Sequence, residues 1–395
     1  MYDFTTQVDR SGSGSGKWDA MKRKNPKLAK GIVPLSVADM EFKTAPEITG
    51  GLRDFLDGLV LGYSGPTERY YQAVRLWMKR RHGWEIEDDW IVSSGGVVSA
   101  FYNAVNALAA PGQGVIIMPP VYPPFFSAVE LNQRALAVNP LLLKNGRYEI
   151  DFDDLEAKAK DPNNRVLLFC SPHNPVGRVW EAEELKRVGD ICLRNGVKII
   201  SDEIHFDLVM PGFSHRVFAA LGEEYAQNMI VCTAPSKTFN IAGMQVSNII
   251  IPNRELRKQY TDEVIRHLGH PQLNILAYRA CEIAYTRCEA WLEELITVID
   301  ANRKMVEEFF ARRIPRIRPF PLEGTYLQWW DCRELGMDHR ELENFMVNEA
   351  QLFLDEGYIF GDAGRGFERV NLACPPATLE AALERLAGAL EARLN

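Results

Sequence analysis

Short, strongly apolar runs alternate with longer amphipathic stretches along much of the chain. Five of the apolar runs predict buried strands, at Val115–Met118, Arg165–Cys170, Val197–Ser201, Met229–Thr233 and Asn248–Ile251. Strands separated by amphipathic helices are typical of a mostly parallel sheet with helices packed on its faces. The pattern therefore predicts an α/β fold.

The stretch Glu181–Asn195 gives the clearest helix signal. Apolar residues recur at Leu185, Val188 and Ile191, and Gly196 follows at the position of a C-terminal stop. A helix between two parallel strands makes a crossover that is right-handed by default.

The pattern changes towards the C-terminus. From about Cys281 to Arg313 the residues predict one long charged helix, and two strand-like runs follow at Thr325–Trp330 and Glu368–Ala373. This change indicates a second, smaller α+β domain.

We expect three parts along the chain. Residues 1–47 are an N-terminal segment that packs with the small domain, residues 48–288 form the large cofactor-binding domain, and residues 289–395 form the small domain. The tract Ser11–Gly16 is interpreted as a flexible linker or an exposed loop and is given no chemistry.

Composition restricts the class of partner. The formal net charge is −8 and the sequence pI is near 5.6, so no basic surface for nucleic acid or for an anionic membrane is expected. The seven cysteines are odd in number and show no C-x-x-C pair, which favours a reducing compartment and no cysteine metal site. With no apolar signal core and no membrane-length apolar run, we expect a cytoplasmic protein.

Polar residues follow three successive predicted strands. Asn174 comes after the first, Asp202 and His205 after the second, and Lys237 after the third. Taken singly, they have ordinary interpretations as a turn residue, a helix N-cap, a core histidine and a solvated loop lysine. In an open α/β sheet, however, the carboxyl ends of neighbouring strands meet at one ligand crevice.

Together, these residues match the needs of pyridoxal 5′-phosphate (PLP). Asp202 can keep the ring nitrogen protonated, and the amide of Asn174 can donate to the phenolic oxygen. Lys237 can hold the aldehyde covalently and, once displaced by a substrate amine, can remove the α-proton. The sequence therefore predicts PLP as the cofactor and no metal.

Several motifs extend this pattern over nearly the whole chain. They are Pro34–Phe42, Gly62–Pro66, Pro119–Phe125, Ser171–Gly177, Ser201–Asp207, Ala234–Gly243 and Arg369–Pro375. In this ordered set the chain resembles the fold-type I PLP enzymes of the class I/II aminotransferase superfamily, and within it the MalY/PatB-type cystathionine β-lyases. The resemblance implies an α/β/α large domain like that of aspartate aminotransferase, plus the smaller domain.

The resemblance also implies roles for further residues. Gly96, Val97 and Val98 precede or begin a helix whose N-terminus can bind the cofactor phosphate, with Ser236 as a further contact. Tyr122 corresponds to the catalytic aromatic residue that stacks on the pyridine ring.

The remaining implied roles concern the partner subunit and the substrate. Tyr63 corresponds to a tyrosine donated across a homodimer interface to the partner's phosphate, so the active sites would be shared. Arg369 corresponds to the arginine that binds the substrate α-carboxylate, with Ala38 and Asn174 beside the substrate.

The chain differs from the broader aminotransferase pattern at three positions. Ala234 stands where many of those enzymes have a serine, and Gln245 stands where they often have a phosphate-binding arginine. His205, which we expect to contact the cofactor, stands where most have a tyrosine, and this points to the lyase branch.

The predicted activity is cleavage of L-cystathionine, or of a related cysteine S-conjugate, to a thiol, pyruvate and ammonia. The alternative is an aminotransferase that passes the amino group to a 2-oxo acid. A third possibility is a regulatory protein that retains the fold, although the full set of Asn174, Asp202, Lys237 and Arg369 disfavours it. A dinucleotide-dependent dehydrogenase is disfavoured because no Gly-x-Gly-x-x-Gly opens a helix after the first strand.

Overall fold

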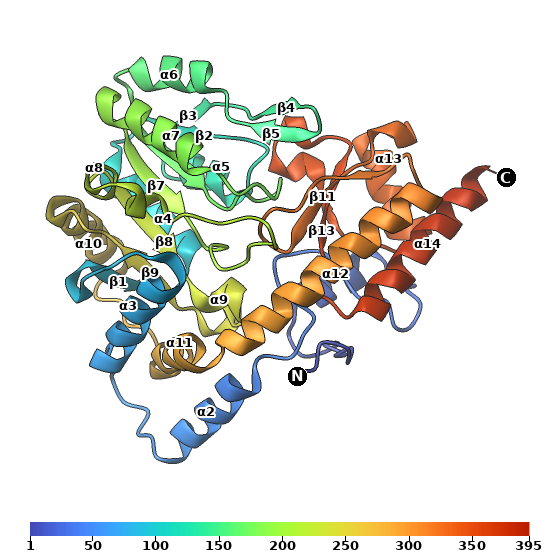
Figure 1. The fold of residues 1–395 in the computed structure, drawn as a ribbon, viewed down its shortest axis with the longest axis horizontal. Coiled ribbons are helices and arrows are strands. Elements are labelled where there is room, and N and C mark those ends of the chain that lie inside the picture. The colour runs from blue at the N-terminus through green and yellow to red at the C-terminus, as the bar shows by residue number, and fades with distance from the viewer. Residues whose placement is uncertain (395) are drawn as a thin grey trace.

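The computed structural model describes residues 1–394 and contains two separate main sheets (Figure 1). The larger sheet has seven strands with helices on both faces, and the smaller one has four strands. The long helix α12 (Glu289–Arg313) runs from the region of the large sheet to the small one, where it packs against α14 (Pro376–Leu394). The predicted α/β fold is confirmed.

The large sheet is mostly parallel, and its strand order is β1-β9-β8-β7-β6-β2-β3. Only β9 runs antiparallel to its neighbours. The strands are β1 (Ile91–Ser94), β2 (Gly114–Ile117), β3 (Ala135–Val138), β6 (Asn164–Cys170), β7 (Lys198–Asp202), β8 (Met229–Thr233) and β9 (Ser247–Ile250). All five predicted strands are present, with small shifts at their ends.

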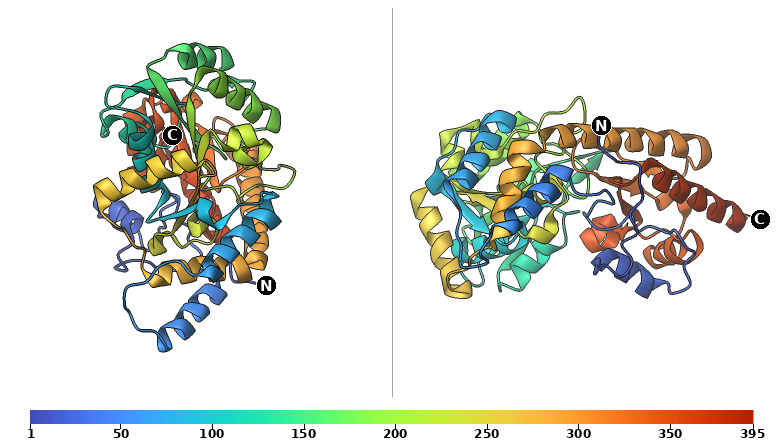
Figure 2. Two further views of the ribbon diagram at one scale, coloured as in Figure 1. Left: turned by 90° about the vertical axis from the view of Figure 1, so that its left-hand side faces the viewer. Right: turned by 90° about the horizontal axis from the view of Figure 1, so that it is seen from below.

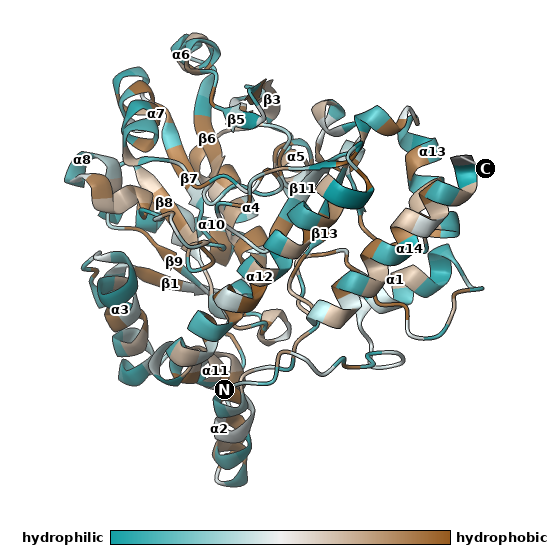
Figure 3. Ribbon diagram, turned by 45° about the vertical axis from the view of Figure 1, so that its right-hand side comes forward, coloured by the Kyte–Doolittle hydropathy of each residue, from teal (hydrophilic) through white to brown (hydrophobic). Residues whose placement is uncertain are grey.

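Successive side chains of each central strand pack alternately into two hydrophobic cores, one on each face of the sheet. Val115 and Ile117 pack with α4 (Val97–Leu108), α5 (Pro124–Glu130) and α10 (Arg254–Leu268) on one face. Ile116 packs in the core on the opposite face, which contains α3 (Glu68–His82), α6 (Phe152–Lys160), α7 (Ala182–Asn195) and α11 (Ile275–Arg287). Successive strand side chains point to opposite faces, so a strand covered on both sides is apolar throughout. Figure 3 shows these strands as brown ribbons among helices with teal outer faces.

The caps explain where the helices around the sheet begin and end. Helix α7 starts with a capping box between Glu181 and Glu184 and ends at Gly196, whose φ of 70° is left-handed. The helix predicted at Glu181–Asn195 and its glycine stop are therefore confirmed.

The prediction of one long helix from Cys281 to Arg313 is wrong. Two helices, α11 and α12, meet at Cys288, whose φ of −108° and ψ of 15° are not helical. Helix α11 packs on α3 and on α2 (Pro46–Asp57), whereas α12 leads to α14. The chain bends at Cys288 because the two helices pack against different partners.

The small sheet has the order β10-β11-β13-β12 and is antiparallel throughout. Its strands are β10 (Arg318–Pro319), β11 (Leu327–Asp331), β12 (Asp355–Glu356) and β13 (Phe367–Asn371). The two strand-like runs predicted here correspond to β11 and β13. Register pairs Asp355 with Arg369, so these two side chains start from neighbouring positions.

The N-terminal segment lies against the small sheet (Figure 2). Trp18 and Met21 of α1 (Gly16–Lys24) pack with Phe353 in a small apolar cluster. Leu35 extends the contact, because its N–H donates to the Phe353 carbonyl and its own carbonyl accepts from the Asn371 N–H. The domain boundaries at residues 47/48 and 288/289 remain predictions.

Candidate active site

A cavity of about 490 Å³ lies at the carboxyl ends of β6, β7 and β8 and reaches the small sheet. Nearly all the predicted site residues line it: Ala38, Gly96, Val97, Val98, Tyr122, Asn174, Asp202, His205, Ser236, Lys237 and Arg369. Tyr63 is not among the lining residues. The cavity therefore collects side chains that are far apart in the sequence, as expected for the crevice of an open α/β sheet.

Lys237 lies in α9 (Pro235–Thr238), a short helix that follows β8 directly. Its Nζ atom donates a hydrogen bond of 2.6 Å to the carbonyl oxygen of Ala38. Burial of the ammonium lowers the pKa of Lys237 to about 8, assisted by Arg369 and opposed by Asp39 and Asp202. An amine with this pKa is partly uncharged near neutral pH and can accept a proton.

Asp202 ends β7, and its side chain is buried at the floor of the cavity. Burial raises the pKa of Asp202 to about 7, although the N–H of Ile204 and the charge of Lys237 both favour the carboxylate. The site thus holds an acidic group whose charge lacks full compensation from the described residues. A cation placed beside Asp202 would lower this pKa and restore the carboxylate.

A buried side-chain network connects the segments that carry Lys237 and Asp202. Thr238, directly after the lysine, donates its hydroxyl to Asp207 Oδ2 at 2.7 Å. Asp207 belongs to the loop that follows β7, and it also accepts from Trp77 Nε1 at 3.1 Å. The hydrogen bond between Thr238 and Asp207 holds the helix that carries Lys237 against the loop that follows Asp202.

Arg369 of β13 reaches the cavity between two acceptors. Its Nη1 donates to Asn174 Oδ1 at 2.9 Å, and its Nη2 donates to Asp355 Oδ2 at 2.5 Å. The guanidinium also lies over the ring of Phe360, at 4.8 Å from the centroid. These contacts fix the plane of a cation that can bind a carboxylate through two N–H groups.

His205 is buried in the same wall. Burial, together with the nearby charges of Lys237 and Arg369, lowers the pKa of His205 well below its usual value, so the ring is neutral. The ring packs edge-to-face on Tyr326, and among the described residues Nδ1 has no hydrogen-bond partner. The neutral imidazole thus lines the cavity without adding a charge to it.

Helix α4 points its N-terminus at the cavity. Gly96 is its N-cap residue, with φ 157° and ψ 152°, and Gly96, Val97 and Val98 line the space in front of the first free N–H groups. Among the described residues, no side chain caps this helix end. Free N–H groups and the helix dipole together favour an anion such as a phosphate.

Tyr122 follows β2, and its backbone N–H donates to the Asn174 carbonyl at 3.2 Å. Burial raises the pKa of the Tyr122 phenol, so the hydroxyl stays protonated. Ser236, directly before Lys237, lines the cavity, and Gln245 lines it too. Ala234 is fully buried.

Two cavity residues were not predicted from the sequence, Asp355 and Val37, which lies next to Ala38. Both line the cavity, and Asp355 holds Arg369. Asp355 gives no signal in the sequence, because its role depends on strand pairing with a residue 14 positions away. Among the described residues no cluster of histidine, cysteine and carboxylate side chains could hold a metal ion.

Comparison with known proteins agrees with this geometry. The sequence profile described as "Aminotransferase class I and II" matches residues 30–386. The chain is 41% identical to cystathionine beta-lyase PatB of Bacillus subtilis, over 98% of this chain and 100% of PatB. It is 30% identical to protein MalY of Escherichia coli, over 99% of this chain and 100% of MalY.

Among solved structures, cystalysin from Treponema denticola superposes with a TM-score of 0.98 at 52% identity and covers 100% of both chains. That crystal structure contains a pyridoxal 5′-phosphate cofactor. A PLP-bound C-S lyase from Staphylococcus hominis matches with a TM-score of 0.91 at 31% identity, over 99% of this chain and 98% of that one. The chain therefore belongs to the class I and II aminotransferase family.

Proposed function

We propose that this protein is a PLP-dependent carbon–sulfur β-lyase that acts on L-cystathionine or on a related cysteine S-conjugate. The observation that carries the proposal is the convergence of Lys237, Asp202 and Arg369 on one cavity in a chain 41% identical to a cystathionine β-lyase. The products are a thiol, pyruvate and ammonia.

The residues present fit PLP. The buried Asp202, whose pKa is raised to about 7, lacks a full cationic partner, and a protonated pyridine nitrogen would supply one. The uncapped N-terminus of α4 at Gly96 suits the phosphate. Tyr122 borders the cavity where an aromatic ring could stack, and Ser236 lies beside the lysine.

PLP, when bound, supplies an electron sink for negative charge at the substrate α-carbon. Arg369 orients the substrate by binding its α-carboxylate, and Asp355 and Asn174 hold the guanidinium in place. Lys237 Nζ, with its pKa of about 8, removes the α-proton. The electron pair that this proton leaves behind expels the sulfur substituent from the β-carbon, and water then releases pyruvate and ammonia.

An aminotransferase is the second candidate, because the family profile bears that description. In both reactions Lys237 first removes the α-proton. In a lyase the substrate then loses its β-substituent, whereas in an aminotransferase the substrate keeps it, gives up its amino group and leaves as a 2-oxo acid, so that a second 2-oxo acid is needed to accept the amino group. Two of the relatives reported above, a cystathionine beta-lyase and a C-S lyase, favour the lyase.

We further propose that the active unit is a homodimer in the cytoplasm, in which Tyr63 binds the partner's cofactor phosphate. In support, Tyr63 is fully exposed on a loop that also exposes Val60 and Leu61. All seven cysteines are free and buried, which suits a reducing compartment. Within residues 1–394, no helix has the length and hydropathy to cross a bilayer.

The cofactor assignment can be tested by labelling. PLP added to the purified protein should give an absorption band at about 420 nm, which Lys237→Ala should lack. Borohydride reduction should attach the phosphopyridoxyl group to the peptide that contains Lys237. Labelling of a different lysine, or no labelling, would overturn the assignment.

A further inference from the structure

The turn Val37–Asp39 forms one wall of the cavity and has an unusual backbone. Val37 and Ala38 both line the cavity, and Val37 has a φ of 58°. The left-handed conformation is unfavourable for a β-branched residue and persists only where the surroundings enforce it.

Side chains from the small sheet hold one side of this turn. The Val37 N–H donates to Asp355 Oδ2 at 2.8 Å. Asn371 Nδ2 donates to the carbonyls of Val37 and Asp39, at 2.9 Å each. The turn is therefore tied to the same Asp355 that holds Arg369.

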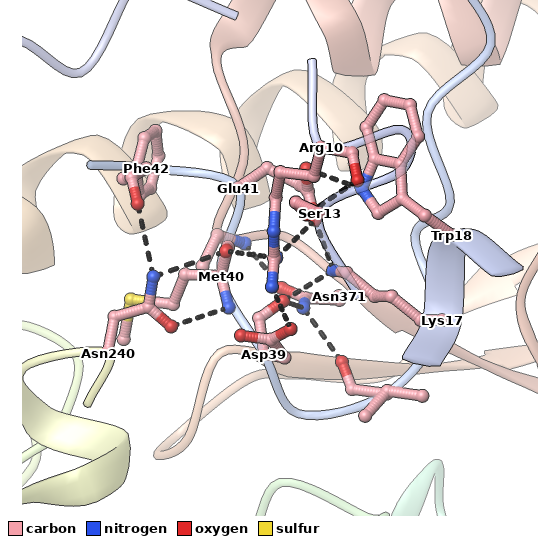
Figure 4. Close-up of polar contacts among 12 residues, drawn as sticks. Arg10, Ser13, Lys17, Trp18, Asp39, Met40, Glu41, Phe42, Asn240 and Asn371 are labelled. Atoms are coloured by element: carbon pink, nitrogen blue, oxygen red, sulfur yellow. Dashed lines mark hydrogen bonds and ion pairs between the residues drawn. The ribbon is translucent and has the colours of Figure 1, made fainter. Parts of the chain in front are cut away.

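The N-terminal segment holds the other side (Figure 4). The side chain of Lys17 in α1 is 1% exposed, and its Nζ donates to the Asp39 carbonyl at 2.5 Å and lies 2.6 Å from Glu41 Oε1. Glu41, 2% exposed, also accepts from Trp18 Nε1 at 3.1 Å and from Arg10 at 3.0 Å. Arg10 further pairs with Asp39 Oδ2 at 2.8 Å.

The location of the buried Lys17–Glu41 network indicates a role other than stabilising the fold. A buried ion pair adds little net stability, because desolvation of both charges offsets their attraction. The hydrogen bonds of such a pair nevertheless hold the atoms around it in one arrangement. Here they hold the turn Val37–Asp39, which contacts Lys237. Lys17 thus joins α1 to the Asp39 carbonyl, one residue after the Ala38 carbonyl that accepts the hydrogen bond from Lys237 Nζ.

We propose that Lys17 is a positioning residue of the active site. By holding the Asp39 carbonyl and Glu41, it keeps the strained turn Val37–Asp39 in place, so that the Ala38 carbonyl orients the amine of Lys237. The inference concerns the placement of the turn and rests on the proposed function only for its consequence in proton transfer.

Hydrogen exchange in the cofactor-free protein tests the placement directly. The amides of Asp39, Met40 and Glu41 donate to Val37 O, Asn240 Oδ1 and Ala373 O respectively. We expect Lys17→Met to raise exchange in a peptide covering residues 36–42 about tenfold or more, with no change in the peptide that contains β7.

Lys22→Met is the matched control, because Lys22 lies on the same helix and is exposed. Exchange at residues 36–42 that is the same in the two variants would overturn the proposal. If Lys17→Met fails to fold, Lys17→Arg replaces it. Its planar guanidinium keeps the charge but cannot occupy the position of the ammonium, so exchange should still rise about threefold, and wild-type exchange would overturn the proposal.

Steady-state kinetics of the holoenzyme test the consequence. Lys17→Met should lower kcat about tenfold, whereas KM should change less than about threefold, because Asp355 and Asn174 rather than α1 hold Arg369. Equal kcat values for Lys17→Met and Lys22→Met would contradict a positioning role. A wild-type protein without lyase activity would refute the proposed function alone, because the exchange measurement requires no turnover.

Discussion

At the scale of single residues, burial shifts the ionisation of the two groups that define the chemistry of the cavity. The pKa of Asp202 is raised to about 7 and that of Lys237 is lowered to about 8, so both groups titrate close to neutral pH. Burial without full compensation is typical of ligand and catalytic sites.

Asp202 predicts a specific dependence of stability on pH in the cofactor-free protein. The pKa of Asp202 is about 7 in the folded state against 3.8 for an unperturbed aspartic acid side chain, so between these values the folded state binds more protons than the unfolded state. The stability contributed by protonated Asp202 is complete below about pH 4 and is lost as the pH rises to about 7. Chemical denaturation of wild type and Asp202→Asn across this range should show that wild type loses stability relative to the variant.

Bound PLP should change this behaviour. A cationic ring nitrogen beside Asp202 lowers the pKa of this carboxyl group. In the holoenzyme near pH 7, the difference in stability between wild type and Asp202→Asn should therefore change sign. A difference that does not depend on pH in either form would contradict the assignment of Asp202.

Arg369 predicts a loss of substrate affinity on replacement. Lysine keeps the charge of Arg369 but cannot offer two parallel N–H groups to a carboxylate, so Arg369→Lys should raise KM about tenfold or more with a smaller change in kcat. Arg365→Lys is a suitable control, because Arg365 is exposed and its partners among the described residues are Asp362 and His339, which lie outside the cavity. Equal KM values in the two variants would exclude Arg369 as the carboxylate ligand.

The sequence predicts the site residues that directly follow strands of the large sheet. It does not predict the side chains of the N-terminal segment and the small sheet that hold site residues in place. Asn174, Asp202 and Lys237 follow β6, β7 and β8, so their meeting in one cavity follows from the order of the strands. Asp355 and the Lys17–Glu41 pair depend on tertiary packing of the N-terminal segment and the small sheet, which no local pattern encodes.

At the scale of elements, the N-terminus of α4 should provide the phosphate site. Gly96 adopts a φ of 157°, which other residues rarely adopt, so Gly96→Ala should displace the loop. The variant should bind PLP about tenfold more weakly, while its affinity for pyridoxal, which lacks the phosphate, should hardly change. Titration by fluorescence can compare the two ligands, and equal losses for both would contradict a phosphate site at α4.

The more completely a strand is buried, the more clearly the sequence predicts it. The central strands are apolar on both faces and were found, whereas the edge strands β1 and β3 are partly exposed and give a weaker signal. The separation of α11 from α12 was missed because the helical pattern continues through Cys288, and only packing against different neighbours bends the chain there.

At the scale of the whole molecule, the position of Tyr63 outside its own cavity predicts complementation between subunits. Lys237→Ala and Tyr63→Ala should each be poorly active alone. In a mixed dimer, one site combines the intact Lys237 of one chain with the intact Tyr63 of the other. Random mixing should therefore restore about a quarter of wild-type activity, measured after refolding an equimolar mixture, and no recovery would argue against shared sites.

The central claim is that this site eliminates a thiol rather than transferring an amino group. The most direct test is incubation of the PLP-loaded protein with L-cystathionine and no 2-oxo acid, with pyruvate and free thiol followed over many turnovers. The two products should appear continuously and in equal amounts, and Lys237→Ala should form neither. Turnover that starts only when a 2-oxo acid is added would contradict the claim.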